Sequence, residues 1–284
     1  MKRINLVVAV LLLACIMATQ YGLPLEITPA QAEESSVRGD YQKTFPVENI
    51  SEISLKIPNG VVLVSGSAEA DQIILKGEYS VQGKKPETCE KLLEKIKIED
   101  KIDGQTLNIN AEIKDRKHYD INCYLEVIIP WDMNVVVNVK SGLAEIRNTD
   151  GKVQVNVRNG DVFCDNLSGS LEFFVLNGGM FISELSGHAN GISGNGGTTI
   201  QCDDTLPASL DLVSVNGGVR VKLHKIPDAT LSALSATAYV HLVGEDNLAN
   251  RLVRSYEATL GRGTNKYSIQ SLNGSVTLDL PKVQ

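Results

Sequence analysis

The fold is decided by residues 153–169, which read VQVNVRNGDVFCDNLSG. Valines alternate with polar residues at the start of this stretch, and that period of two is typical of a strand with one buried face. Asn159 and Gly160 then supply a tight turn, because glycine adopts a positive φ at little cost. A second alternation follows at Val162 and Cys164. The segment therefore predicts two short strands joined by a turn.

The same unit recurs along the chain at a spacing of 18 residues, which later lengthens to 21. Apolar positions keep the register, and one inward column reads Val137, Val155, Phe173 and Gly191. A single unit cannot bury its apolar side alone, but stacked units with aligned columns can. The turn-forming residues are Asn59, Gly60, Gly142, Asn159, Gly160, Asn177, Gly178, Asn195, Gly196, Asn216, Gly217, Asn273 and Gly274.

We therefore expect an all-β fold, a β-helix or β-solenoid with two-strand rungs of about 18 residues. The asparagines before the turns should stack into a hydrogen-bonded ladder along the axis. The lengthened rungs 210–221 and 231–242 should follow one another, and a last unit at 269–278 should close the chain. A meander of Asn-Gly hairpins is the alternative, and the shared register of the inward columns favours the solenoid.

The N-terminus predicts export. Residues 1–32 are typical of a signal peptide, with Lys2 and Arg3 before an apolar run and a small-x-small site ending at Ala32. A lipoprotein signal is the alternative, in which Cys15 becomes lipidated. An uncleaved anchor is a third reading. The expected location is the periplasm, the outer envelope or the extracellular space, and the membrane is reached only through this segment, if it is lipidated or uncleaved.

The rest of the chain divides into a flexible linker over 33–44, an N-terminal β region over 45–132 and continuous rungs over 133–284. Within the N-terminal region, strands are expected at 73–79, 106–112 and 121–129. A helix is expected at 86–96, because proline is tolerated in a first turn and an apolar stripe follows it. We expect this helix to cover the open edge at the N-terminal end of the stack.

Charge and cysteine content limit the partners. The net charge of −7 disfavours nucleic acid, which an acidic surface repels. Cys89 and Cys123 both fall on apolar faces, so they either form a disulfide or remain buried thiols. The chain contains no CxxC pair that would indicate zinc. We expect neither a metal nor another cofactor.

Catalytic motifs are weak throughout. The histidines lack metal-ligand spacing, and Asp203-Asp204 falls in a predicted turn rather than across a cleft. Gly194-Asn195-Gly196-Gly197 is similar to calcium-binding rolls but lacks their repeated aspartate. A polysaccharide-active enzyme rests on fold analogy alone. We therefore expect a protein that is not an enzyme.

The outward face carries unexpected apolar residues. Phe163 is predicted beside Phe181, and Phe174 beside Ile192, with Leu176 near. Because a solvated strand face is normally polar, these residues predict a partner-binding patch for an envelope protein or a glycan. The alternative is that the N-terminal insert or residues 244–266 cover the patch.

The rung pattern of residues 155–162, the turn Ile57-Pro58-Asn59-Gly60 and the closing segment 272–276 resemble the bacterial putative-adhesin family of β-strand-repeat envelope proteins. The resemblance covers roughly residues 45–281. It implies a right-handed β-helix at the cell envelope and provides no catalytic residues. The expected function is a non-enzymatic binding module that uses a flat sheet face. The alternative is a structural or envelope-stress regulatory protein tethered through a lipidated Cys15.

Overall fold

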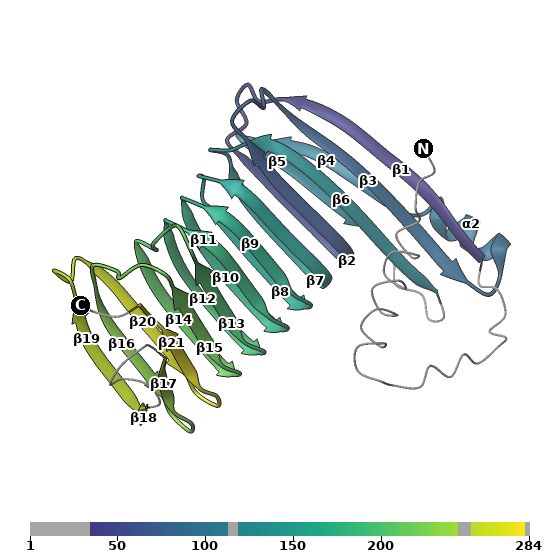
Figure 1. The fold of residues 1–284 in the computed structure, drawn as a ribbon. Helices are drawn as coiled ribbons and strands as arrows, with labels where there is room; N and C mark the ends of the chain where they lie inside the picture. The colour runs from purple at the N-terminus through teal and green to yellow at the C-terminus, as the bar shows by residue number, and fades with distance from the viewer. Residues whose placement is uncertain (1–34, 113–118, 244–250, 282–284) are drawn as a thin grey trace, which may run out of the picture. The chain divides into compact units, whose positions relative to one another are not determined.

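The computed structural model describes residues 35–112, 119–243 and 251–281. The expected signal peptide, its cleavage site and Cys15 lie outside the described residues. The all-β expectation is confirmed, because α2 (Pro86–Leu93) is the one helix among the described residues and strands make up most of the rest. Figure 1 shows these strands lying side by side in a long series.

The middle of the chain forms two stacks of parallel strands that enclose the core. Each repeat contributes one strand to each stack, and the register advances by 18 or 21 residues per strand. The first stack contains β8 (Val153–Asn159), β10 (Ser170–Asn177), β12 (His188–Asn195) and β14 (Ser209–Asn216). The second stack contains β9 (Val162–Leu167), β11 (Met180–Leu185), β13 (Thr198–Cys202) and β15 (Val219–Leu223).

The predicted inward column is confirmed. Phe173 pairs with Val155 on one side and with Gly191 on the other. Phe173 is only 5% exposed, and a Cβ atom added to Gly191 would lie 2.4 Å from its ring. The missing side chain of Gly191 therefore provides the space for the phenylalanine. A large side chain in one rung is thus accommodated by a glycine at the equivalent position of the next rung.

Two long strands join the stacks. β2 (Glu52–Ser67) and β7 (Asn134–Thr149) pair with each other over almost their whole length, as in Leu55 with Val137 and Val64 with Ile146. Their first halves belong to the first stack and their second halves to the second. The turn at Gly60 and Gly142 bends both strands at the same level.

The expected order of rungs is wrong at the C-terminal end. β20 (Asn265–Ser271) lies between β14 and β16 (Ala229–Ser235), and β21 (Val276–Asp279) lies between β15 and β17 (Val240–Val243). The last rung in sequence is therefore the penultimate rung in space. The columns of inward apolar residues are continuous whether the last rung follows the others or lies between them. The periodicity of the sequence therefore does not distinguish the two orders.

The N-terminal end has a similar exchange. β5 (Thr106–Glu112) and β6 (Asp120–Pro130) follow β2 in sequence but lie on its outer side, so β2 is sandwiched between them and β7.

Antiparallel strands then cover both ends of the series. β4 (Lys97–Asp103) pairs with β5, β3 (Gln72–Gly83) pairs with β6, and β1 (Ser35–Pro46) pairs with β3. At the other end, β19 (Ser255–Leu260) pairs with β16 and β18 (Arg251–Val253) pairs with β17.

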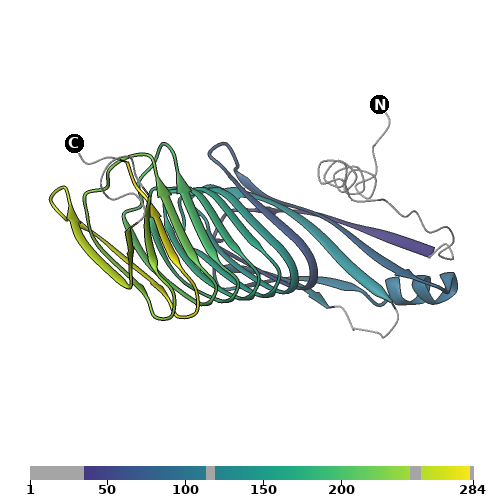
Figure 2. The same ribbon diagram turned by 60° about the horizontal axis from the view of Figure 1, so that its bottom comes forward.

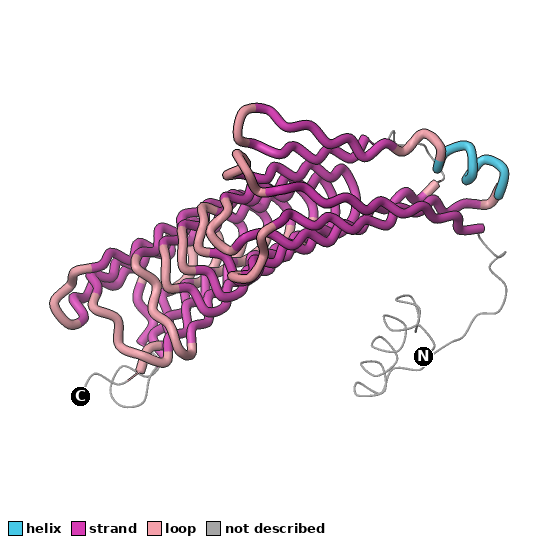
Figure 3. The backbone as a smooth tube through the Cα atoms, turned by 90° about the horizontal axis from the view of Figure 1, so that it is seen from above, coloured by secondary structure: helices cyan, strands magenta, loops and turns pink. Residues whose placement is uncertain are grey.

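The expectation of a uniform coil of two-strand rungs is therefore too simple. The described strands form one 21-stranded sheet that curves into a nearly closed, barrel-like shape around its core (Figures 2 and 3). Only the middle repeats show the regular two-strand rung. The antiparallel pairing at the ends was not predicted, because these residues do not follow the repeat; only β3 was expected as a strand, over 73–79.

Two expectations for the N-terminal region need correction. Residues 35–44, expected to be a linker, belong to β1 and pair with β3 along its length. The helix ends at Leu93 instead of residue 96, and α2 lies at the far end of β1 and β3 (Figure 1). Its Cys89 and Leu92 pack in a small separate cluster with Val81. The edge of the stack is covered by antiparallel strands and not by this helix.

The corners explain why the rungs stack in register. Gly160 has φ 138°, as predicted for a turn glycine, whereas Gly217 and Gly274 are not among the positive-φ glycines. The predicted asparagine ladder is present, and from Asn177 onward each side-chain amide donates to the asparagine of the preceding rung in space. Its members are Asn159, Asn177, Asn195, Asn216 and Asn273, at distances of 2.7 to 2.8 Å.

A second corner was not predicted. Asn148, Asn166 and Glu184 have positive φ at the return from the second stack to the first. The 18-residue recurrence of asparagine at the first two positions was a usable signal, because asparagine tolerates this conformation better than most residues. In the third rung, Glu184 accepts hydrogen bonds from the backbone of Asp203, Asp204 and Thr205, and this contact organises the first lengthened corner.

Candidate binding surface

The predicted neighbours Phe174 and Ile192 lie side by side on the outer face of the first stack. They are 44% and 42% exposed to solvent, respectively, so the described residues do not cover them. Leu176 is half-buried on the same strand as Phe174. These three residues form an outward apolar group, which we call the first-stack patch.

Phe163 and Phe181 are also neighbours, as predicted, but they belong to the second stack. Their rings are stacked, with centroids 4.9 Å apart and planes at 10°. Both point away from the core on a different face from Phe174. The five predicted partner-binding residues therefore form two separate surfaces, because the turn at Asn159 and Gly160 directs consecutive strands into different stacks.

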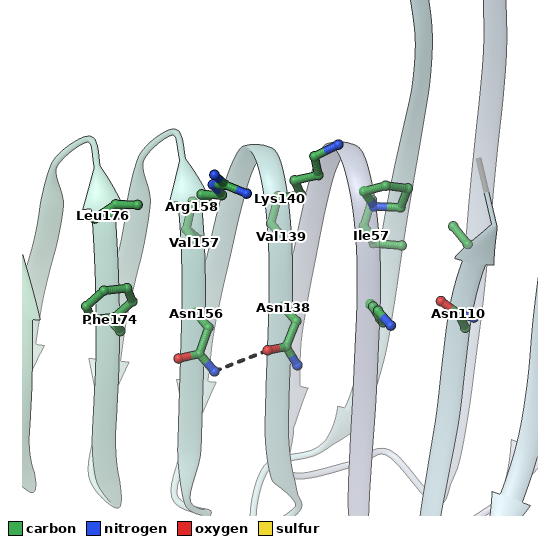
Figure 4. Close-up of a pocket in the computed structure, with 13 residues that line it drawn as sticks. Ile57, Asn110, Asn138, Val139, Lys140, Asn156, Val157, Arg158, Phe174 and Leu176 are labelled. Atoms are coloured by element: carbon green, nitrogen blue, oxygen red, sulfur yellow. Dashed lines mark hydrogen bonds between the residues drawn. The ribbon is translucent and has the colours of Figure 1, made fainter. Parts of the chain in front are cut away.

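A groove of about 490 Å³ adjoins the first-stack patch. It crosses the outer face from β5 over β2, β7 and β8 to β10, where Phe174 and Leu176 line one end (Figure 4). Its floor includes Val139 and Val157 at the corner of the rungs. Asn156 donates a hydrogen bond to Asn138 on the neighbouring strand at 3.2 Å.

The charge of the groove is opposite to that of the chain. Lys56, Lys140 and Arg158 line it, and none of the described lining residues is acidic. The chain as a whole carries a net charge of −7. The cationic lining favours an anion over a cation within the groove. Sequence analysis did not find this basic cluster, since its members are far apart in the chain.

The inserted C-terminal rung extends the apolar surface. Val213 follows Ile192 in the same outward column. Gln270 and then Leu234 continue that column on the next two strands. Leu272, on the inserted rung, is 43% exposed. Sequence analysis missed Leu272 and Leu234 because their strands were expected in the opposite order.

Of the two alternatives for Cys89 and Cys123, the structure has the buried thiols and no disulfide between them. Cys123 is a buried thiol in the main core, whereas Cys89 packs in the smaller cluster of α2 and contacts the Ser35 carbonyl oxygen. Burial raises the pKa of Cys123 to about 11. Burial also raises the pKa of Cys164 and Cys202. Cys202 ends β13 inside the core.

The remaining candidates are on the surface. Asp203 Oδ1 lies 2.9 Å from His224 Nδ1, and Thr277 of the inserted rung separates Arg220 from His241. Among the residues the structure describes, no group of three or more histidines, cysteines or acids is placed to hold a metal ion. Within the same residues, no helix has the length and apolar character needed to span a membrane.

Neither a protein-family model nor a curated protein matches this chain. It is similar to a putative cell adhesion protein of Clostridium sporogenes ATCC 15579, with 11% identity, a TM-score of 0.36, and 87% of this chain and 100% of that chain covered. A putative adhesin of Bacteroides fragilis NCTC 9343 gives 10% identity, a TM-score of 0.36, and coverage of 85% and 97%. A putative lipid binding protein of Parabacteroides distasonis ATCC 8503 gives 12% identity and a TM-score of 0.29, with 87% of this chain and 97% of that chain covered. With likenesses this weak, function must be argued from the residues of this chain.

Proposed function

We propose that this chain is a non-enzymatic binding module of the cell envelope that engages its partner through the outer face of the first stack. The observation that supports it is the exposed first-stack patch beside a groove of about 490 Å³. Exposed apolar groups beside a groove are typical of partner sites, because apolar side chains in contact with water are favourable only when a partner buries them. The proposed partner is an envelope protein or a glycan.

A non-enzymatic role is proposed, and the side chains in the groove support it. Its described lining comprises amides, aliphatic groups, one aromatic ring and cations, without a carboxylate or an imidazole. General acid–base chemistry ordinarily depends on such groups. Secretion is proposed from the N-terminal signal pattern, and the right-handed coil from the resemblance to β-strand-repeat proteins. The parallel, in-register pairing of the middle strands is compatible with such a coil.

A binding experiment tests the proposal. Purified wild-type protein and a Phe174→Ser, Ile192→Ser variant are compared for capture of isolated envelope proteins and of defined cell-wall glycans. We expect the variant to lose at least about tenfold in affinity for the captured partner, since each apolar contact contributes of the order of 1–2 kcal/mol.

The matched control is Phe163→Ser with Phe181→Ser on the second stack, which removes a similar exposed apolar area. This control should leave binding unchanged. Equal binding by all three proteins would overturn the proposal.

A lipid-tethered structural or regulatory role is the alternative, and its support is the sequence Leu12-Leu13-Ala14-Cys15. Mass spectrometry of the mature N-terminus tests it. A diacylglyceryl group on Cys15 supports the tether, and a mature chain that begins at Glu33 excludes it.

A further inference from the structure

We infer that the groove on the first stack binds a free anionic amphiphile with one alkyl chain. The inference rests on the proposed binding role of this face and adds a small-molecule ligand to its protein or glycan partner. It commits to a soluble single-chain molecule and not to a membrane surface.

The length and lining of the groove suit an alkyl chain. Five adjacent strands, β5, β2, β7, β8 and β10, contribute to it. At a strand separation of ~4.8 Å this corresponds to roughly 19 Å. One leaflet of a bilayer, half of a ~30 Å hydrocarbon core, indicates that an extended acyl chain needs roughly 15 Å. The apolar groups at the corner and the ring of Phe174 give such a chain surfaces on which to pack.

The charges of the groove suit an acidic head. Lys140 and Arg158 occupy equivalent outward positions on neighbouring strands, since each follows the paired residues Val139 and Val157. The positive charge of Arg158 attracts an anionic head group. Lys56 lies one strand further, on β2. Lys56 and Arg158 form no ion pair with any described residue.

The groove separates its charged groups from its apolar groups. The groove has a cationic side formed by Arg158 and its neighbours and an apolar end formed by Phe174 and Leu176 (Figure 4). An amphiphile matches both regions at once.

Calorimetry with dodecanoate, below the concentration at which it forms micelles, tests the inference on the folded protein. We expect saturable binding to the wild type. Phe174→Ser should weaken it by about tenfold. Arg158→Gln should weaken it by about fivefold and reduce its dependence on salt. The matched controls are Phe181→Ser and Arg220→Gln, both exposed and on the second stack, and they should bind as the wild type does.

Related ligands separate the head from the chain. Dodecyl maltoside keeps the alkyl chain without the charge, and butyrate keeps the charge without the long chain; both should bind at least about tenfold more weakly than dodecanoate. The inference is overturned if dodecanoate does not bind, or if Phe174→Ser and Phe181→Ser behave alike. Binding only to vesicles of phosphatidylglycerol, or only to polygalacturonate, would also overturn it.

The experiment distinguishes this inference from the proposed function. If the first-stack variant loses its envelope partner but dodecanoate does not bind the wild type, the amphiphile is excluded and the binding role stands. If the variant loses neither partner nor amphiphile, both fail.

Discussion

Among single residues, the turn glycines set how closely neighbouring rungs approach. Gly160 has φ 138°, and a Cβ atom there would lie 1.6 Å from the carbonyl oxygen of Gly142. The clash is with backbone, which the hydrogen bonds between rungs hold in place. We expect Gly160→Ala to lower the free energy of unfolding by about 3 kcal/mol or more, measured by urea denaturation.

Gly104 provides the matched control, because it also has a positive φ, 60°, but a Cβ atom added there would have no other atom within 4 Å. Gly104→Ala should cost only about 1–2 kcal/mol, the conformational penalty without the clash. Equal losses for the two variants would contradict the role of close approach.

The pair of Phe173 and Gly191 makes a second prediction at this scale. Gly191→Ala should cost about 2 kcal/mol, because the added methyl group meets the phenylalanine ring. Phe173→Leu frees space for that methyl group. The loss of unfolding free energy in the double variant with Gly191→Ala should therefore be about 1 kcal/mol smaller than the sum of the two single losses. Urea denaturation of the four proteins gives the coupling energy, and strict additivity would contradict the packing.

Much of this residue-level detail was accessible from the sequence. The 18-residue recurrence placed Gly160, Asn159 and Phe173 correctly, since like positions in stacked rungs must superpose. The role of Glu184 was not accessible. Its carboxylate accepts hydrogen bonds from a corner about 20 residues later, and no local pattern encodes that contact.

Among the elements, the inserted rung changes which strands depend on one another. Ile269 in β20 and Leu231 in β16 are both buried, but β20 lies between β14 and β16. Ile269→Ala should therefore speed amide hydrogen exchange in β20, β16 and β19 together, because loss of β20 leaves β16 without its inner neighbour.

Leu231→Ala is the control, and it should speed exchange in β16 and β19 while β20 retains most of its protection. A stack that followed sequence order would give the reverse result, with the larger effect from Leu231→Ala. Mass spectrometry of exchanged peptides distinguishes the two orders.

The corner at Glu184 gives a pH-dependent prediction. Burial alone would raise the pKa of Glu184, but hydrogen bonds from Asp203, Asp204 and Thr205 lower it below its ordinary value. Because the pKa is lowered, ionised Glu184 stabilises the fold at any pH above its ordinary pKa of ~4.3. This stabilisation is lost as the pH falls through the lowered pKa of the folded protein. Glu184→Gln should therefore cost about 1 kcal/mol at neutral pH and progressively less below pH ~4. A cost that does not change with pH would contradict this assignment.

At this scale the sequence predicts strands better than their order. β5 was predicted with its observed bounds, and β6 within one residue at each end. The neighbours of β2 and β20 were not predicted, because any rung presents the same inward column to any other. Register specifies which residues align, but loop connections decide which strands meet.

For the whole molecule, the buried thiols predict alkaline sensitivity. The pKa of Cys123 is raised to about 11, and burial raises those of Cys164 and Cys202 as well. The protonated thiols stabilise the fold fully below the unfolded pKa of ~8.5, and the contribution is lost as the pH rises through the folded values. Stability in urea should therefore fall between pH ~8.5 and ~11. A variant with alanine at these three positions should lose less stability over this interval, and an unchanged slope would contradict the prediction.

The candidate surface was partly predictable at this scale. The alternation of apolar and polar residues identified Phe174 and Ile192 as outward-facing, and their exposure agrees with this. The groove was not predictable, because Lys56 and Arg158 line the same groove only as a result of the pairing of β2, β7 and β8. Side chains about 100 residues apart in sequence have no shared local pattern.

The place of β20 and β21 has a consequence for synthesis. A chain emerging from the N-terminus presents β14 to β17 before the segment that must lie between them. Until residues 265–279 have left the ribosome or crossed a translocation channel, β14 and β16 lack their native neighbour. Completion of this end must therefore wait for the last stretch of polypeptide, so a nascent chain stays open at its C-terminal end while the middle rungs already have their partners.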